Sequence, residues 1–157
     1  MKYCIREMKE QEYPLLSDFL YEAIFQRDEN HLAPRTIIND PALQIYIQDF
    51  GTEKDDACLC AEVGGKVVGA VWVRNIAGYG DTGEDTPEFA ISLYKEYRGY
   101  GIGTEMMRQM LVLLKSKGYR KASLAVQKDN DALRMYQKVG FQIIDENVEE
   151  YIMVYYF

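Results

Sequence analysis

A glycine-rich loop between a strand-like and a helix-like stretch is the feature that most limits how this chain can fold. Gly99, Gly101 and Gly103 fall within five residues. Residues 88–94 (EFAISLY) before them have the composition of a strand, and residues 101–117 after them repeat apolar side chains with helical spacing. A strand that runs through a glycine loop into a helix is typical of folds in which helices cover the faces of a sheet.

The same loop has the features of an anion site. Glycine lets the backbone approach a ligand closely, and the unpaired N–H groups of a helix's first turn, with the helix dipole, favour a phosphate. The spacing excludes two familiar phosphate motifs: GxxxxGK[ST] lacks its lysine, and GxGxxG would need a third glycine where Met106 stands. The alternative is a loop whose glycines only shape a tight turn.

Periodicity along the rest of the chain predicts the element order β-α-α-β-β-β-α-β-α-β-β. Gly64 and Gly65 separate two β-rich runs, and because both positions tolerate positive φ they predict a two-residue hairpin. This order predicts an α/β (α+β) fold, with a mixed sheet and helices on its faces. The expected strands are 3–7, 57–63, 67–73, 88–94, 122–126, 141–145 and 151–155, and the expected helices are 14–25, 41–50, 101–117 and 131–139.

Length and charge exclude several classes of protein. The 157 residues suit a single domain spanning 1–157, and 48% hydrophobic residues supply a core. A net charge of -7 without a basic cluster argues against nucleic acid or an anionic membrane as partner. No apolar signal segment or membrane span is present, which predicts a cytoplasmic protein.

The cysteines and the histidine exclude further chemistry. Cys4, Cys58 and Cys60 are odd in number and lack metal or redox spacing, so buried thiols are expected and no metal site. His31 is the only histidine, in a polar stretch typical of a loop. Sites built on two or more histidines are therefore excluded.

Two motifs together resemble the GNAT superfamily of N-acetyltransferases. The pattern [RQ]-x-x-G-x-[GA] is matched by Arg98, Gly101 and Gly103, and residues 130–141 (NDALRMYQKVGF) are similar to the family's N-x-x-A-x-x-x-Y-x-x-x-G-F helix. The resemblance covers residues 56–157 well and residues 1–55 only in element order. It implies a mostly antiparallel sheet of about seven strands, with two central parallel strands that splay apart, and about four flanking helices.

The resemblance also implies an acetyl-CoA site between the splayed strands. Backbone groups of Ile91, Ser92 and Leu93 would bind the pantetheine arm. The pyrophosphate would be wrapped by the loop residues Arg98, Gly99, Tyr100, Gly101, Ile102, Gly103 and Thr104. A further contact would come from Asn130, with Asp129 as the alternative, since by residue count Asp129 falls at the family's usual asparagine position. Backbone dipoles and a few cations would then be enough to bind the polyanionic coenzyme. The net negative charge of the protein is therefore compatible with an acetyl-CoA site.

For the reaction, the resemblance implies direct attack of an amine on the thioester in a ternary complex. Tyr136 would be the general acid, and its alternative role is aromatic core packing. Glu88 is a possible general base, against the alternatives of a solvated strand-end acid and a water relay. The N–H near Leu93 would hold the oxyanion. A different hypothesis is an acyl-CoA-binding or sensor module of the same fold without turnover.

The acceptor is the part of the function that the sequence leaves open. Residues 25–50 and 75–87 would shape its pocket, and it would be a small-molecule amine, a protein lysine or a protein N-terminus. The acidic residues Asp81, Glu84, Asp85, Glu149 and Glu150 would attract a cation, or form ordinary solvated loop charge. Trp72 is expected in a strand near the acceptor side. Tyr151, Tyr155 and Phe157 alternate on one face of the last strand and predict core or dimer packing, and a homodimer is plausible.

Overall fold

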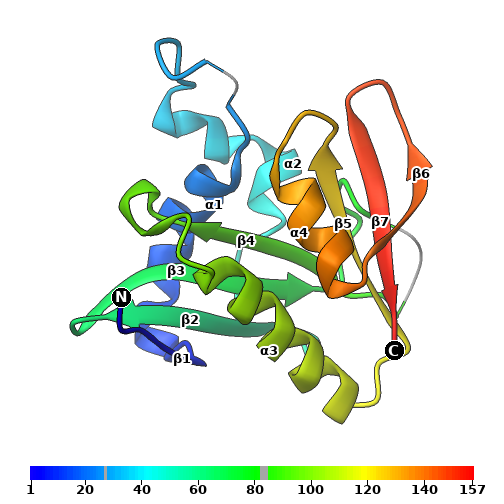
Figure 1. Cartoon of the computed structure of the whole chain (residues 1–157), viewed down its shortest axis with the longest axis horizontal. Coiled ribbons are helices and arrows are strands. Elements are labelled where there is room, and N and C mark those ends of the chain that lie inside the picture. The colour runs from blue at the N-terminus through cyan, green and yellow to red at the C-terminus, as the bar shows by residue number, and fades with distance from the viewer. Residues whose placement is uncertain (27, 82–84) are drawn as a thin grey trace.

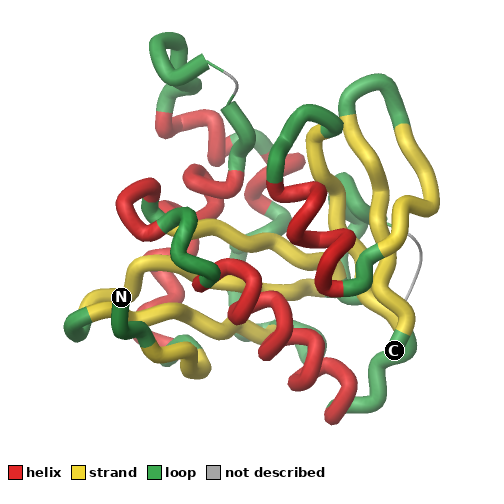
Figure 2. The backbone as a smooth tube through the Cα atoms, in the orientation of Figure 1, coloured by secondary structure: helices red, strands yellow, loops and turns green. Residues whose placement is uncertain are grey.

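The computed structural model describes residues 1–26, 28–81 and 85–157, and in them the chain forms one seven-stranded sheet (Figures 1 and 2). The strand order is β1-β2-β3-β4-β5-β7-β6, and every neighbouring pair is antiparallel except β4 and β5. The expected mixed, mostly antiparallel sheet is therefore confirmed. The strands are β1 Cys4–Glu7, β2 Ala57–Val63, β3 Lys66–Arg74, β4 Glu88–Leu93, β5 Lys121–Gln127, β6 Gln142–Glu146 and β7 Glu150–Tyr156.

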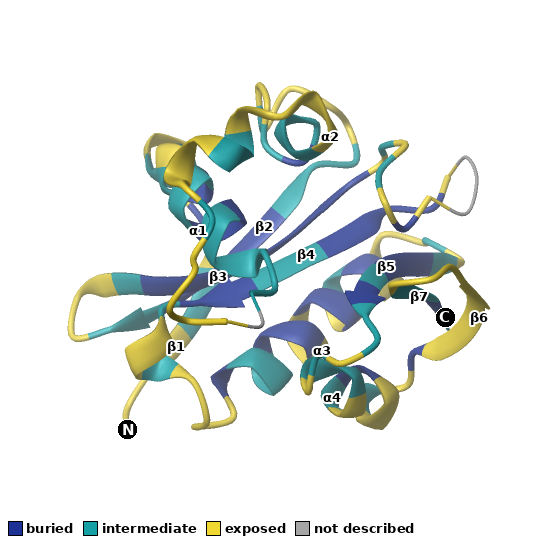
Figure 3. Cartoon of the chain, turned by 90° about the horizontal axis from the view of Figure 1, so that it is seen from above, coloured by how far each residue is buried: buried dark blue, intermediate teal, exposed yellow. Residues whose placement is uncertain are grey.

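Helices cover both faces of this sheet. In Figure 3 α1 and α2 lie above the sheet and α3 and α4 lie below it. Short 3-10 turns precede α1, α2 and α3. The α-helices are α1 Leu16–Ala23, α2 Pro41–Gln44, α3 Ile102–Ser116 and α4 Ala132–Val139, and the turns are η1 Glu10–Leu15, η2 Arg35–Asn39 and η3 Lys95–Tyr97.

Each layer buries its own apolar cluster. Phe19 of α1 packs with Trp72 and the buried thiols of Cys58 and Cys60. The expectation of a buried thiol is wrong for Cys4, which is exposed at the start of β1 on the edge of the sheet. Beneath α3, the apolar stripe of the helix meets the opposite face of the sheet. The helical periodicity of residues 101–117 is thus explained by burial of Ile102, Met106, Met107, Met110, Leu111 and Leu114. Tyr151, Tyr155 and Phe157 pack against this second cluster, as their alternation indicated.

The two parallel strands separate soon after they meet. β4 and β5 share a single registered pair, Glu88 with Ser123, and the N–H of Ser123 donates to the carbonyl of Pro87 at 3.0 Å. Beyond that pair the strands diverge toward their carboxyl ends (Figure 1). Among the described residues, backbone groups along the divergent edges therefore have no strand partner and face an opening in the sheet.

Glycines make the turns at the places where the sequence suggested them. Gly64 and Gly65 have φ of 56° and 82° and join β2 to β3, which confirms the hairpin. Gly101 has φ of 82° and precedes α3, and Gly140 has φ of 118° and ends α4.

The two expected N-terminal helices are shorter than their apolar patterns. Asp40 caps α2 by accepting a hydrogen bond from the N–H of Ala42, but the helix stops at Gln44 and residues 45–51 continue as hydrogen-bonded turns. Asp49, with φ of 52°, interrupts further helix there. Within the described ranges, none of the helices is long and apolar enough to cross a membrane.

Candidate active site

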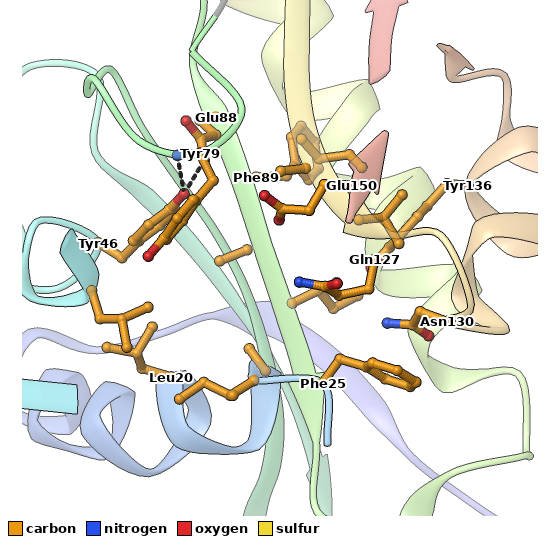
Figure 4. A pocket seen from close by; sticks show the side chains of 18 of the residues that line it. Leu20, Phe25, Tyr46, Tyr79, Glu88, Phe89, Gln127, Asn130, Tyr136 and Glu150 are labelled. Carbon is orange, nitrogen blue, oxygen red and sulfur yellow. Dashed lines mark hydrogen bonds between the residues drawn. The ribbon is translucent and has the colours of Figure 1, made fainter. Parts of the chain in front are cut away.

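The opening between β4 and β5 leads into a cleft of about 350 Å³ (Figure 4). Its lining comes from both sheet halves and from the segments around α1 and α2. Phe25, Ile37, Leu43, Tyr46 and Tyr79 come from residues 25–50 and 75–87, which the sequence analysis assigned to the acceptor pocket, whereas Leu20, Ala23 and Ile24 precede them. The lining residues are Leu20, Ala23, Ile24, Phe25, Ile37, Leu43, Tyr46, Tyr79, Glu88, Phe89, Ala90, Ile91, Leu124, Ala125, Val126, Gln127, Asn130, Tyr136, Glu149 and Glu150.

Strand register determines which polar side chains share the α1 and α2 side of the sheet. Glu88 is opposite Arg74 in β3 and level with Ser123 in β5. Gln127 is opposite Glu150 in β7. Side chains of paired residues point to the same face and alternate along each strand, so all five lie on one face. Residues 89, 91 and 93 point to the α3 side.

Glu88 is a buried carboxyl, with 2% of its surface exposed. The Tyr46 hydroxyl donates a hydrogen bond to its Oε2. Burial raises the pKa of Glu88 to about 7, although the bonds from Tyr46 and from the Gly80 N–H favour the ionised form. The alternative of a solvated strand-end acid is therefore wrong. A carboxyl with this pKa exchanges protons near neutral pH, as a general base must.

Tyr46 is a site residue that the sequence analysis missed. Its hydroxyl accepts a hydrogen bond from the Tyr79 N–H at 2.9 Å and its carbonyl accepts one from Trp72 Nε1 at 3.0 Å. The ring stacks on that of Tyr79, with centroids 6.4 Å apart. Burial raises the pKa of Tyr46, so the phenol keeps its proton for Glu88. In the sequence, Tyr46 occupies an apolar position of a helical pattern, as a core tyrosine does, so nothing marked it as a site residue.

Gly78 lets the Tyr79 loop lie directly over this pair. A Cβ at Gly78 would stand 2.6 Å from the Tyr46 hydroxyl and 2.8 Å from Glu88 Oε1. These distances are too short for any side chain. The loop before β4 therefore needs glycine there to bring the Tyr79 N–H to the Tyr46 hydroxyl.

Three polar atoms near the parallel pairing are buried without a hydrogen-bond partner in the described part of the chain. They are Thr86 Oγ1, Glu88 Oε1 and Ser123 Oγ. Ser123 is paired with Glu88 in the sheet, and Thr86 lies two residues before it. Unpaired buried polar atoms are usually satisfied by ordered water, which is also a carrier of protons.

Tyr136 lines the cleft from α4 and is also part of the core beneath α3. Its ring meets the edge of Phe141 with centroids 6.3 Å apart. Burial raises the pKa of its hydroxyl to about 12, so this phenol stays protonated at neutral pH. Tyr136 therefore packs in the core, as one of the two alternatives had it, and also lines the cleft. Its role as general acid stays a prediction.

Backbone groups along β4 alternate in direction. The Tyr94 N–H donates to the Val68 carbonyl at 2.9 Å, so even-numbered residues bond toward β3 and the N–H groups of Ile91 and Leu93 turn toward the opening. The Leu93 carbonyl accepts from Arg98 Nε at 2.9 Å. Ser92 faces the other way, and its hydroxyl donates to the Phe19 carbonyl at 2.6 Å. Of the three, Ile91 lines the cleft.

The glycine loop presents its backbone at the start of α3. Gly99 and Gly101 have φ of 86° and 82°, and no atom lies within 4 Å of where their Cβ would be. Gly101 provides no side-chain cap, and the first intrahelical bond runs from Glu105 N to Gly101 O. The N–H groups of Ile102, Gly103 and Thr104 therefore have no partner in the helix.

Other loop residues have mixed surroundings. Tyr100 is exposed and Ile102 is buried in the core. Arg98 donates from Nη2 to Glu22 Oε2 at 3.0 Å, so its side chain bridges the loop to α1. The open glycines and the unpaired N–H groups suit an anionic group such as a diphosphate.

Asn130 and Asp129 differ in position. Asn130 lines the cleft, and its Oδ1 accepts a hydrogen bond from the N–H of Ala132, the first residue of α4, at 2.9 Å. Asp129 is not among the lining residues.

The acidic residues that the sequence analysis considered for attracting a cation lie in different surroundings. Glu149 and Glu150 line the cleft, Asp81 and Asp85 are exposed, and Glu84 lies outside the described residues. Over the described ranges, no group of three or more His, Cys, Asp or Glu side chains could hold a metal ion.

Known proteins share this sequence pattern and this fold. The model of the acetyltransferase (GNAT) family matches residues 5–141. An acetyltransferase of Pectobacterium atrosepticum is 31% identical over 108 residues, which are 68% of this chain and 71% of that protein. An acetyltransferase of Sodalis glossinidius is 32% identical over 108 residues, which are 68% of this chain and 70% of that protein.

Among solved structures, the PaiA N-acetyltransferase of Thermoplasma acidophilum in complex with coenzyme A has a TM-score of 0.74 to this chain. The two are 20% identical, and the match covers 100% of each chain. At that identity the likeness shows the fold alone.

Proposed function

Because the chain belongs to the acetyltransferase (GNAT) family, we propose that it transfers an acetyl group from acetyl-CoA to a primary amine. One observation carries the proposal: a single cleft holds a buried carboxyl with a pKa near neutrality, Glu88, and a protonated phenol, Tyr136. These are the two kinds of group that direct acyl transfer to an amine requires. The coenzyme A in the Thermoplasma structure supports acetyl-CoA as the donor.

The residues around the opening fit acetyl-CoA, which supplies the activated acetyl thioester. We assign the diphosphate to the glycine loop, where the N–H groups of Ile102, Gly103 and Thr104 have no partner within the helix. The N–H groups of Ile91 and Leu93 turn toward the opening and suit the pantetheine amides, which then pair as an added strand would. Asn130, which lines the cleft, is the assigned side-chain contact, in place of Asp129.

Glu88 is assigned as the base. An amine arrives mostly as ammonium, and a carboxylate with a pKa near 7 removes one proton and passes it to solvent. The amine nitrogen then forms the C–N bond while the C–S bond breaks. A second nitrogen proton balances the one taken up by the thiolate, so one proton leaves per turnover.

Leu93 and Tyr136 are assigned to stabilise the negative charges that develop on the carbonyl oxygen and on the leaving thiolate. The Leu93 N–H stabilises the oxyanion, which needs a fixed dipole and no particular side chain. The Tyr136 hydroxyl donates its proton toward the departing thiolate. With its pKa raised to about 12, the phenol is protonated in nearly every molecule at neutral pH.

The proposal is tested by thiol release. Purified protein is incubated with acetyl-CoA and a panel of amines, and free coenzyme A is measured. Acetyl-CoA should raise the melting temperature through ligand linkage, and at least one amine should stimulate thiol release. A rise in melting temperature without thiol release for any amine or peptide would instead favour the acyl-CoA-binding module without turnover.

Tyr136→Phe tests the general acid. The variant keeps the ring that packs on Phe141, so we expect the fold and the acetyl-CoA-induced rise in melting temperature to persist. Loss of the proton donor should lower kcat roughly 100-fold. Full activity of Tyr136→Phe with a good acceptor would contradict this role.

Three further expectations are part of the proposal. A single acetyltransferase domain over residues 1–157, a cytoplasmic location and a homodimer stay predictions. The absence of a cationic cluster around the cleft, in the part of the chain that the structure describes, supports a small amine or a protein amine over nucleic acid as acceptor.

A further inference from the structure

The described walls of the cleft carry negative charge and no positive charge. Glu88, Glu149 and Glu150 line it, and none of the described lining residues is a lysine, arginine or histidine. Such a site attracts cations and offers nothing to pair with a carboxylate on the acceptor. An amine without an acidic group is therefore the acceptor that fits.

Glu150 supplies a second carboxylate to the cleft, from a different strand than the proposed base Glu88. It stands in β7 opposite Gln127, whereas Glu88 stands in β4, across the opening. Both side chains lie on the same face, and Figure 4 shows the Glu150 carboxylate pointing into the cleft. The charge of Glu150 raises the pKa of Glu88, so the two groups are close enough to interact.

Glu150 has no cationic partner among the described residues. Its pKa is raised mainly by burial, and a hydrogen bond from the Asn147 side chain only partly offsets that burial. The ionised form of a half-buried carboxylate is poorly solvated, so a cation that binds beside it stabilises its charge. Because no described side chain supplies the cation, the acceptor is its natural source.

Part of the wall on the α1 and α2 side of the cleft is apolar, although Tyr46 brings a hydroxyl group to it. The apolar part is well suited to methylene groups between two charged ends. It consists of Leu20, Ala23, Ile24, Ile37 and Leu43.

We propose that the acceptor is an aliphatic diamine, with the reacting amine at Glu88 and the second ammonium held by Glu150. The methylene chain lies in the cleft against its apolar wall. This inference rests on the proposed acetyltransferase function and makes Glu150 a specificity residue of that site. The reaction itself is unchanged: one amine is acetylated and the other stays an ammonium.

The test compares diamines with monoamines of equal chain length. Diaminopropane, diaminobutane, diaminopentane and diaminohexane are assayed beside propylamine, butylamine, pentylamine and hexylamine at constant ionic strength. We expect kcat/KM to be about tenfold higher for the best diamine than for its monoamine, as one partly desolvated ion pair provides. Equal values for all four pairs would overturn the inference and leave the proposed function standing.

The Glu150→Gln variant tests whether Glu150 causes the preference for diamines. It should lower kcat/KM for the diamine about tenfold more than for the matched monoamine, mainly through KM. The monoamine rate also reports whether the variant is folded. Glu10→Gln, in the exposed η1 turn outside the cleft, removes the same charge and should keep the wild-type preference.

Three outcomes contradict the inference. One is a diamine preference that survives Glu150→Gln, and another is a preference that Glu10→Gln abolishes equally, which would indicate only long-range charge attraction. The third is an absence of turnover with every amine and peptide, in which case the proposed function fails and this inference fails with it.

Discussion

Glu88 shows how the environment of one residue decides its chemistry. An exposed glutamate is ionised at neutral pH, but burial brings the pKa of Glu88 to about 7. The sequence pointed to this position through family resemblance alone, and it could not separate a base from a solvated acid. The Tyr46 hydroxyl on Oε2 comes from a residue 42 positions earlier in the chain.

The pH dependence of the rate tests the role of Glu88. The base works when ionised, so kcat/KM should rise with pH through about 7 and then level off, apart from titration of the acceptor amine. Glu88→Gln should lower kcat roughly 100-fold and remove the step near pH 7. Glu10→Gln is the charge-matched control. A rate step near pH 7 that persists in Glu88→Gln would assign the titration to another group.

At the scale of elements, α3 depends on the turn that starts it. Gly101 is in the left-handed region, at φ of 82°, whereas Gly103 two residues later is inside the helix. The glycine spacing and the helix that follows were predictable from the sequence, because a left-handed residue before a helix is a local requirement. The lengths of α1 and α2 did not follow from the apolar pattern. The backbone becomes extended at Ile24 after α1, and Arg74 in β3 bonds the carbonyls of Ile45 and Gln48 after α2.

Gly101→Ala and Gly103→Ala separate these two positions. A side chain at Gly101 is strained by the positive φ, so Gly101→Ala should lower the free energy of unfolding by about 1 kcal/mol. A Cβ at Gly103 meets only Leu93 Cδ1, at 3.8 Å, and alanine favours the helix, so Gly103→Ala should not destabilise the protein. Urea denaturation of the ligand-free variants measures both effects, and equal losses would refute the assignment of strain to Gly101.

At the scale of the molecule, Arg74 joins the α2 segment to the sheet. It pairs with Asp56 at 2.9 Å and donates from Nη1 to the carbonyls of Ile45 and Gln48. The side chains of Arg74 and Asp56 are only 6% and 1% exposed. The segment that carries Tyr46 is therefore held to the sheet through this buried ion pair.

Asp56→Ala tests that connection. It leaves Arg74 buried without its carboxylate, and it also removes the acceptor of the Gly51 N–H. We expect the free energy of unfolding to fall by about 3 kcal/mol. Glu53→Ala is the control, since that exposed side chain should change stability by less than about 0.5 kcal/mol. Similar losses in the two variants would show that the ion pair contributes little.

Local signals in the sequence determined the glycine turns, the order of strands and helices, and the two motifs that place Arg98 and Tyr136. Each depends on residues a few positions apart, so the chain encodes it without reference to the rest of the fold. Tertiary structure alone decided that Glu88 is buried, that Tyr46 donates to it and that Glu150 faces the same cleft. Those relations join residues distant in sequence, and only the register and divergence of β4 and β5 bring them together.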